Sequence, residues 1–287
     1  MDEEKPTAVL LLSCQDQNGL VARIANFIFE RKGNILDLSE HVDSQGKQFS
    51  IRVAWDISNF TIKESQINEA FVPLAKEYNA NWKICFLAKK IKTAIFVSKT
   101  DHCLHEILWR YSQNEFNADI SLIISNHYDL EPLARQYNIP FYVTPITKET
   151  KLDQEQKQVA LLKKYNVETI ILARYMQILS SGFIALYPSN IINIHHSFLP
   201  AFIGRNPYKQ AFERGVKIIG ASSHFATKDL DEGPIIEQDV VRISHRDSIK
   251  DLIRKGSDLE RLVLVKAIRL HTQHRIIVSG KKTIIFD

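Results

Sequence analysis

The chain has 287 residues, of which 45% are hydrophobic and 24% charged, the usual balance of a soluble globular protein with one large or two ordinary domains. Its 37 basic and 33 acidic side chains are dispersed, and without a polybasic run we expect no nucleic-acid partner. The apolar stretch near the amino terminus is short, so we expect neither a signal peptide nor a membrane span. Cys14, Cys85 and Cys103 are widely spaced, which favours reduced thiols in a cytoplasmic protein over disulfides or a zinc site.

The first part of the chain alternates short strands and helices. Residues 8–14 form an apolar run typical of a buried strand, and a helix is expected from about residue 21 to 32, before Gly33. Segments 34–43 and 48–57 have the pattern of paired strands joined by a glycine-containing turn. A second helix over about 63–78 and a strand over 81–87 complete the order β-α-β-β-α-β, which is that of ferredoxin-like domains.

A charged joint at residues 88–92 precedes a different pattern, so we expect domains at 1–88 and 89–287. Short apolar strands then alternate with helices such as 103–115 and 153–164; the strands are expected at 93–98, 118–125, 139–144, 168–173 and 190–195. Segments 220–227 and 234–243 indicate an antiparallel edge, and a long helix follows over 257–273. The predicted fold class is α/β, with a ferredoxin-like domain followed by a Rossmann-like, mostly parallel sheet.

Polar side chains gather at the end of the last parallel strand. Asn193 and His195 alternate along that strand and therefore share a face, and ligands of open parallel sheets collect outside the carboxyl ends of the strands. Asp231 lies in the turn "LDEGP" between two apolar segments. A lone turn aspartate usually caps a turn, but together with Asn193 and His195 it completes an amide, an imidazole and a carboxylate suited to acyl chemistry.

The segments "NIHHSFLPAFIG" and "HFATKDLDEGPII" resemble the paired signatures of the folate-dependent formyltransferase domain. This resemblance implies a catalytic trio of Asn193, His195 and Asp231 and a cis peptide at Leu199-Pro200. The amino-terminal unit, with "DQNGLVARIANFI", is similar to an ACT domain. An ACT domain followed by a formyltransferase domain is the layout of the formyltetrahydrofolate deformylase family. The resemblance thus implies a cytoplasmic hydrolase that converts 10-formyltetrahydrofolate to tetrahydrofolate and formate, supplying formate for purine synthesis and balancing the one-carbon folate pool.

The trio suits hydrolysis of a formyl amide, which is unreactive because its nitrogen donates into the carbonyl. Attack by water creates an oxyanion, toward which the Asn193 amide and a protonated His195 would both donate hydrogen bonds. Asp231 would orient and deprotonate the water and pass a proton to the leaving nitrogen, and its charge favours a protonated His195. We therefore expect no metal and no tightly bound cofactor, and water and the folate substrate as the reactants.

Two alternatives stay open from the residues. The same trio could transfer the formyl group to an amine, although "FVSKTDHCLHEIL" lacks the glycine-rich phosphate loop of glycinamide ribonucleotide transformylases; Lys99 and His102 could still bind an anion. A methionyl-tRNA formyltransferase would carry a further basic domain, and the His195-His196 doublet matches the deformylase pattern rather than His-Pro. Arg205 stands where the family resemblance implies a small residue. The other alternative is an ACT-type small-molecule sensor with a silent catalytic domain.

The resemblance also implies binding residues outside the trio. The segment "ARYMQILS" is similar to the pterin-binding part of the family, so we expect folate contacts from Met176, Gln177, Leu179, His196, Thr227 and Asp229. Asn18, Gly19 and Leu20 begin a helix whose free amides could hold an amino-acid effector. ACT domains commonly pair, and an isolated sheet leaves edge strands exposed, so we expect a homo-oligomer, a dimer or tetramer, formed through ACT domains.

Overall fold

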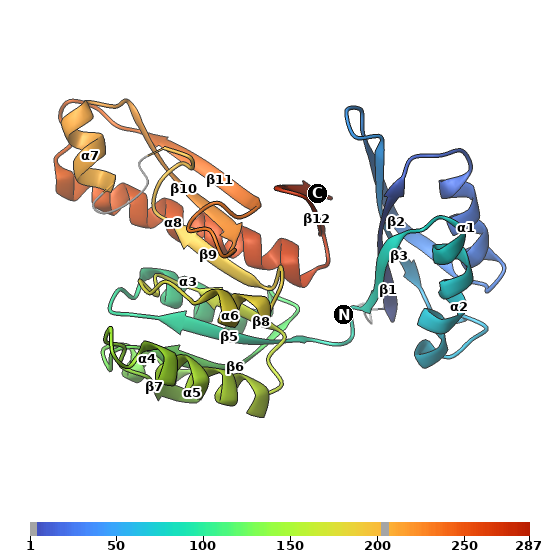
Figure 1. Ribbon diagram of the computed structural model, residues 1–287, viewed down its shortest axis with the longest axis horizontal. Helices are drawn as coiled ribbons and strands as arrows, with labels where there is room; N and C mark the ends of the chain where they lie inside the picture. Colours follow the sequence, from blue (N-terminus) through green and yellow to red (C-terminus); the bar gives the residue numbers. More distant parts are fainter. Residues whose placement is uncertain (1–4, 202–206) are drawn as a thin grey trace. The chain divides into compact units, whose positions relative to one another are not determined.

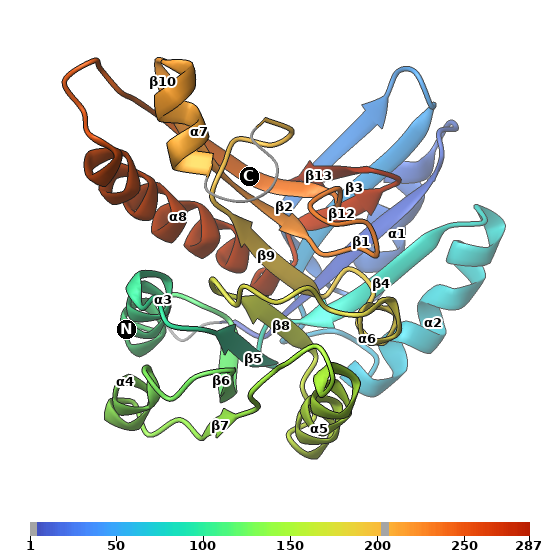
Figure 2. The ribbon, with the colours of Figure 1, turned by 60° about the vertical axis from the view of Figure 1, so that its left-hand side comes forward.

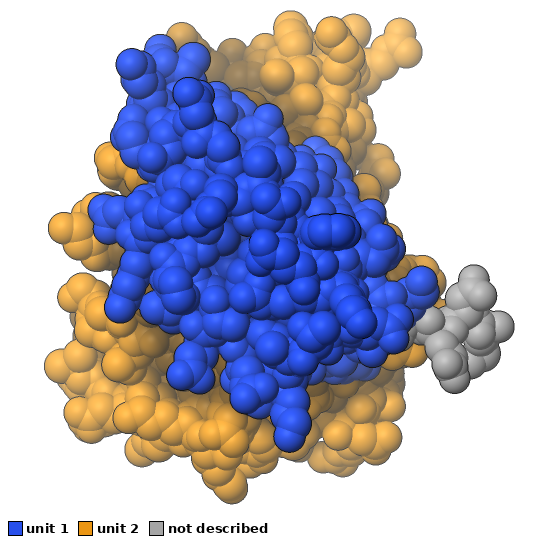
Figure 3. Space-filling view, turned by 90° about the vertical axis from the view of Figure 1, so that its right-hand side faces the viewer, with its two compact units in different colours: residues 1–90, 273–279, 283–287 blue, residues 91–272, 280–282 orange. Residues whose placement is uncertain are grey.

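The computed structural model describes residues 5–201 and 207–287, so Arg205 lies outside the described residues. The chain divides into two compact units, which Figure 3 shows in two colours. Unit 1 comprises Met1–Lys90, Gln273–Ser279 and Thr283–Asp287, and unit 2 comprises Ile91–Thr272 and Gly280–Lys282. In the described ranges, no helix has the combination of length and apolar character that crossing a membrane requires.

Unit 1 has the predicted β-α-β-β-α-β order. Its elements are β1 (Thr7–Gln15), α1 (Leu20–Phe29), β2 (Asn34–Asp43), β3 (Gln48–Asp56), α2 (Glu64–Glu77) and β4 (Asn81–Phe86). The strands form an antiparallel sheet in the order β2-β3-β1-β4, which confirms the ferredoxin-like arrangement. Both helices lie on one face of this sheet (Figure 1), and their apolar stripes, with Ile24 and Phe71 fully buried, pack on the inward residues of the strands.

The end of the chain packs with unit 1. Strands β12 (Ile276–Ser279) and β13 (Lys282–Ile285) form a two-stranded hairpin, and Ile277 and Phe286 bury their side chains against Leu11 of β1. Arg52 of β3 donates from Nε to the carbonyl oxygen of His274 at 3.0 Å. Apolar side chains on both faces of β1 explain its nearly continuous burial, because the helices cover one face and this hairpin the other.

Unit 2 is built on a seven-stranded sheet in the order β11-β10-β9-β8-β5-β6-β7. The strands are β5 (Ile91–Val97), β6 (Ala118–Ser125), β7 (Phe141–Val143), β8 (Thr169–Leu172), β9 (Ile191–His195), β10 (Ile218–Phe225) and β11 (Ile235–Arg242). The five strands from β7 to β9 pair in parallel, and β10 and β11 add an antiparallel edge, which confirms the predicted mostly parallel sheet. The strand order reverses between β5 and β8, the position where Rossmann-type sheets bind ligands.

Helices cover both faces of this sheet. They are α3 (His102–Ser112), α4 (Glu131–Gln136), α5 (Lys151–Lys164), α6 (Ser181–Ala185), α7 (Pro207–Arg214) and α8 (Ile249–Thr272). Figure 2 shows α3 and α8 on one face and α5 and α6 on the other. Helices α5 and α6 pack on β5, β6, β8 and β9 through the buried side chains of Leu162 and Phe183. With helices on both faces the strands are apolar throughout, as the sequence indicates.

Helix α8 is longer than predicted. The sequence favours a helix over 257–273, whereas α8 begins at Ile249 and passes through Gly256. A Cβ at Gly256 would lie 2.0 Å from the hydroxyl of Tyr208, so the glycine is required by packing and does not end the helix. The approach of Tyr208 to the backbone of α8 is a tertiary contact, which the local sequence pattern of the helix does not reveal.

Candidate active site

Asn193 and His195 occupy the carboxyl end of β9. They alternate with Ile194 along the strand, so both side chains project from the same face, as predicted. The antiparallel neighbour β10 places Ser222 opposite His195 and His224 opposite Asn193. His195 is buried and Asn193 half-buried, which puts both polar groups where water has limited access.

The loop between β10 and β11 places Asp231 next to His195. Residues 226–234 form a loop closed by a hydrogen bond from the Phe225 amide to the Pro234 carbonyl at 2.9 Å. Gly233 is needed in that loop, since a Cβ there would come within 1.7 Å of the Phe225 carbonyl oxygen. Asp231 itself has a left-handed backbone, with φ of 57°, which is uncommon outside glycine and marks a position held by its surroundings.

The carboxylate of Asp231 faces two imidazoles. Its Oδ2 lies 3.2 Å from Nδ1 of His195, and its Oδ1 lies 3.6 Å from Nε2 of His224. Burial alone would raise the pKa of the Asp231 carboxyl, but opposing interactions, led by the hydrogen bond from His195, outweigh it and hold that pKa well below its ordinary value. Asp231 is therefore ionised throughout the neutral range.

His224 is a site residue that sequence reasoning missed. It is 2% exposed, and its Nδ1 lies 3.0 Å from the Phe225 carbonyl oxygen, which can only accept, so Nδ1 carries a proton. In the neutral ring Nε2 is then the acceptor, and the Asn193 amide donates to it at 3.1 Å. The signal was present in the sequence, because His224 falls within the segment "HFATKDLDEGPII" and belongs to the strand paired with β9.

The second nitrogen of His195 is open for a ligand. With Nδ1 directed at Asp231, Nε2 is buried and has no hydrogen-bond partner among residues 5–201 and 207–287. A buried imidazole nitrogen without a partner costs free energy, on the order of 1–3 kcal/mol, unless a bound group or water satisfies it. This atom and the second hydrogen of the Asn193 amide are two unused hydrogen-bonding groups beside the Asp231 carboxylate.

A pocket lies beside these groups. Its walls include Asn193, His224 and Asp231, residues from the end of β8 to α6, and residues from the loop after β10: Leu172, Gln177, Ile178, Leu179, Ile184, Ala226, Thr227, Lys228 and Leu230. Three of the expected folate contacts, Gln177, Leu179 and Thr227, are therefore beside the trio. Asp229 holds the second loop, because its carbonyl oxygen accepts from the Thr227 hydroxyl at 3.0 Å.

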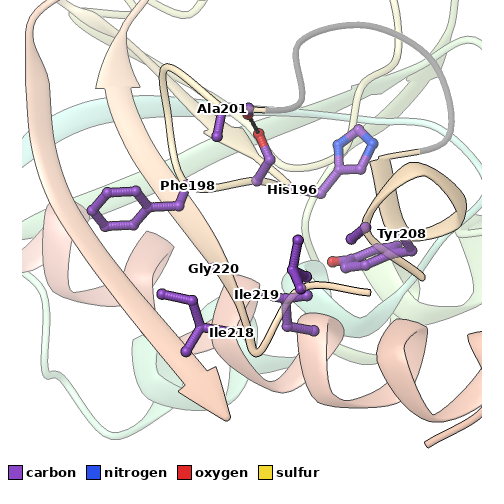
Figure 4. Close-up of a pocket in the computed structure, with 10 residues that line it drawn as sticks. His196, Phe198, Ala201, Tyr208, Ile218, Ile219 and Gly220 are labelled. Atoms are coloured by element: carbon purple, nitrogen blue, oxygen red, sulfur yellow. Dashed lines mark hydrogen bonds between the residues drawn. The ribbon is translucent and has the colours of Figure 1, made fainter. Parts of the chain in front are cut away.

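Met176 and His196 are not among the residues that line this pocket. Met176 is 62% exposed and has a left-handed backbone, with φ of 59°. His196 instead lines a second, mainly apolar pocket together with Tyr208 and Gly220 (Figure 4). Burial, followed by the charge of Arg174, lowers the pKa of His196 to about 4, so its ring is neutral at pH 7.

The Leu199-Pro200 peptide is cis, as predicted. Ser222 holds the segment before it on β10, since its hydroxyl accepts from the Leu199 amide at 3.0 Å and donates to the Ser197 carbonyl at 2.9 Å. Gln238 of β11 donates to the Leu199 carbonyl at 3.1 Å. These contacts fix the path of the chain directly after the His195-His196 doublet.

The remaining predicted positions lie elsewhere. Lys99 is exposed in the loop after β5, whereas His102 begins α3 and contacts Glu260. In unit 1, Gly19 precedes α1 with φ of 87°, Asn18 is exposed and Leu20 is buried in the core. Gly19, at the N-cap of α1, has no side chain that could cap the first turn of the helix.

Comparison with known proteins agrees with this geometry. Residues 91–268 match the Formyl transferase family model, so the domain that carries Asn193, His195 and Asp231 is a formyl transferase domain. Over its length the chain belongs to the formyltetrahydrofolate deformylase family.

Two relatives and one solved structure support this assignment. The deformylase of Synechocystis sp. is 54% identical over 280 residues, covering 98% of each chain. That of Bacillus subtilis is 45% identical over 97% of this chain and 93% of its own. The crystal structure of a deformylase from Pseudomonas syringae pv. tomato superposes with a TM-score of 0.98 at 39% identity, covering 100% of this chain and 96% of the other.

Proposed function

We propose that the chain hydrolyses 10-formyltetrahydrofolate to tetrahydrofolate and formate. The observation that carries this proposal is the grouping of an amide, an imidazole and an ionised carboxylate at the strand ends of a formyl transferase domain: Asn193 and Asp231 line one pocket, and His195 lies 3.2 Å from Asp231. Family membership over the whole length of the chain supports water as the acceptor.

The reaction adds water across the formyl C–N bond. A water oxygen bonds to the formyl carbon, the C–N bond breaks, and the products are the secondary amine of tetrahydrofolate, a formate anion and one proton. Asp231 accepts a hydrogen bond from the attacking water and directs its lone pair at the carbon. Because its pKa is low, Asp231 is ionised, and its carboxylate lies 3.2 Å from Nδ1 of His195.

The oxyanion that forms needs donors, and two unused donors are present. His195 Nε2 has no partner among the residues that the structure describes, and one hydrogen of the Asn193 amide remains after the other is given to His224. We assign both to the developing oxyanion. A preorganised donor of this kind typically contributes about two to three powers of ten in rate.

The loops around the pocket are suited to a pterin, whose edge combines donors and acceptors. We assign pterin recognition to the backbone at Gln177 and Leu179 and at Thr227 and Asp229, since these loops border the trio. A buried leucine floor, from Leu172 and Leu179, would support the flat ring. Met176, which is exposed, would meet the substrate only at the rim of the pocket.

Unit 1 we assign as an ACT-type domain that assembles the enzyme into a homo-oligomer. Its edge strand β2 exposes Leu36, Leu38 and Val42, an apolar set that pairing with a second copy would cover. The uncapped start of α1 at Asn18, Gly19 and Leu20 is the proposed effector position. Titrating the full chain with the twenty amino acids by calorimetry tests it, and twenty silent titrations would refute it.

We also propose a cytoplasmic location, because no disulfide joins Cys14, Cys85 and Cys103 in the described part of the chain, which suits a reducing compartment. The experiment that tests the function is direct. The purified chain is supplied with 10-formyltetrahydrofolate and no amine, and tetrahydrofolate and formate are measured. Equal amounts of both are expected. Formyl transfer only when an amine is added would contradict the proposal.

A further inference from the structure

A second polar cluster lies at the point where the strand order of unit 2 reverses. His102 begins α3, which follows β5, and Arg174 stands two residues after the end of β8, the parallel neighbour of β5. Glu260 of α8 and Tyr208 of α7 complete the cluster. In open α/β sheets this crevice, outside the carboxyl ends of the two diverging strands, is where ligands bind.

Glu260 contacts all three other members of the cluster, and each of its carboxylate oxygens accepts a hydrogen bond. The hydroxyl of Tyr208 donates to Oε1 at 2.7 Å, and Nε2 of His102 donates to Oε2 at 2.8 Å. Burial by itself would raise the pKa of Glu260, but the hydrogen bond from His102, the charge of Arg174 and the bond from Tyr208 lower it below its ordinary value. The buried carboxylate is therefore charged, and its two oxygens are already in use.

Arg174 is not satisfied. Its Nε lies 3.5 Å from Oε2 of Glu260, which gives an ion pair, yet Nε and Nη1 are buried and have no hydrogen-bond partner in the described part of the chain. Arg174 also has a left-handed backbone, with φ of 60°, a conformation that a long side chain rarely adopts. A guanidinium has five N–H donors, and leaving buried ones unpaired is costly, so this side chain has capacity for an acceptor.

The cluster adjoins the proposed catalytic trio. Leu172 pairs with Asn193 in the parallel β8–β9 register. Arg174 comes two residues after Leu172, just as His195 comes two residues after Asn193. The His196 ring lies between the two sites, with its centroid 5.2 Å from that of His195 and 5.9 Å from that of Tyr208. Figure 4 shows His196 and Tyr208 together at the pocket that they share.

We infer that Arg174 and its partners bind the formate anion that leaves the reaction. This inference rests on the hydrolysis proposed above, which releases formate next to the negative charge of Asp231. Formate is a planar monoanion whose two oxygens match the N–H fork of a guanidinium. The Arg174 guanidinium, separated from the trio by the His196 ring, would attract the formate anion away from the negative charge of Asp231.

Other ligands fit this cluster less well. Among the described residues, His102, Cys103 and Glu260 each offer one potential metal-ligand atom, and these three atoms lie within 4.8 Å of one another. However, Glu260 already accepts from His102 and Tyr208, and the adjacent Arg174 charge repels a cation. A phosphate dianion carries twice the charge of formate and would meet the buried Glu260 carboxylate more unfavourably.

Proton NMR of sodium formate tests the site on the full-length protein without folate. The formate line is expected to broaden with wild-type protein, and Arg174→Met is expected to weaken formate binding at least tenfold. Arg174→Lys keeps the charge and loses the fork, so a three- to tenfold loss is expected, and this variant decides the question if Arg174→Met does not fold. Arg135→Met, at an exposed arginine of α4, is the matched control and should bind formate as the wild type does.

Three results would overturn the inference: wild-type protein that leaves the formate line unchanged, Arg174 variants that bind formate like wild type, or inorganic phosphate that binds more tightly than formate at the same ionic strength. The hydrolysis assay is read separately. Tetrahydrofolate release without formate binding would refute this site and leave the function intact. Formate binding that depends on Arg174, without tetrahydrofolate release, would support the site and refute the function.

Discussion

Asp231 Oδ2 lies 3.2 Å from His195 Nδ1, although the two residues come from different elements, a loop after β10 and the end of β9. The contact joins a carboxylate whose pKa is held well below its ordinary value to a ring whose other nitrogen is buried and unpaired in the described chain. A charge on one side and an open donor on the other make this pair the centre of the proposed mechanism.

Replacing Asp231 by asparagine should abolish most of the hydrolysis. The substitution keeps the size of the side chain but removes the charge that orients water, so kcat should fall about 10³-fold. Binding of tetrahydrofolate, measured by calorimetry, should change little because the pterin contacts lie on other residues. Asp129→Asn, at an exposed aspartate outside the pocket, is the control and should keep wild-type kcat. A kcat within tenfold of wild type in Asp231→Asn would refute the role.

His224 should act through Asn193. Asn193→Ala removes a proposed oxyanion donor and should lower kcat about 10²- to 10³-fold. His224→Phe keeps a ring in the buried position but removes the acceptor that orients the Asn193 amide at 3.1 Å, so kcat should fall about tenfold or more. The double variant should be no more than about threefold slower than Asn193→Ala alone, because the two residues share one interaction. Effects that multiply would show that His224 works independently of Asn193.

Much of this architecture follows from local pattern. The apolar strands, the two helical periodicities of unit 1 and the alternation of Asn193 and His195 all depend on neighbours in sequence, and each was predictable. His224 was missed because its role depends on strand pairing, which places it opposite Asn193. The packing of the hairpin β12–β13 on β1 and the full length of α8 were not predicted for the same reason: Leu11 and Tyr208, distant in sequence, determine them.

Gly233→Ala should damage the site from a distance. The added Cβ would collide with the Phe225 carbonyl oxygen, a backbone atom that cannot move without opening the 226–234 loop that holds Asp231. We expect a loss of unfolding free energy of about 1–3 kcal/mol and a lower kcat. Urea unfolding and kinetics at saturating substrate measure the two effects. Gly46→Ala, where the nearest atom to the new Cβ is 3.5 Å away, should alter neither. Normal kcat in Gly233→Ala would show that the loop adapts.

His274 should make the stability of unit 1 depend on pH. Burial, followed by the charges of Lys83 and Arg52, lowers the pKa of His274 to about 3. The unfolded chain, with a histidine pKa near about 6.5, therefore binds more protons between pH 3 and 6.5, and this contribution to stability is full above that range and lost as pH falls through it. From pH 7 to 5 the loss should be about 2 kcal/mol.

Replacing His274 by asparagine tests this dependence. Asparagine does not titrate and tolerates the left-handed backbone at this position, where φ is 53°. Urea unfolding of wild type and His274→Asn at pH 7 and pH 5 should give a smaller pH effect in the variant. His245→Asn, at an exposed histidine of unit 2, should retain the wild-type effect. Equal pH effects in His274→Asn and wild type would assign the dependence to other groups.

The edge strand β2 should hold the proposed oligomer together. Leu36 and Leu38 are 47% and 37% exposed on a strand that has β3 on one side only within this chain, so its other backbone edge is unpaired among the described residues. Replacing both leucines by lysine places charges on the edge, which disfavours strand pairing between copies. Light scattering at micromolar concentration should show at least a dimer for wild type and a monomer for Leu36→Lys/Leu38→Lys. Leu152→Lys, at a 66% exposed position of α5, should assemble as wild type does. A monomeric wild type would refute assembly, and an oligomeric double variant would move the interface away from β2.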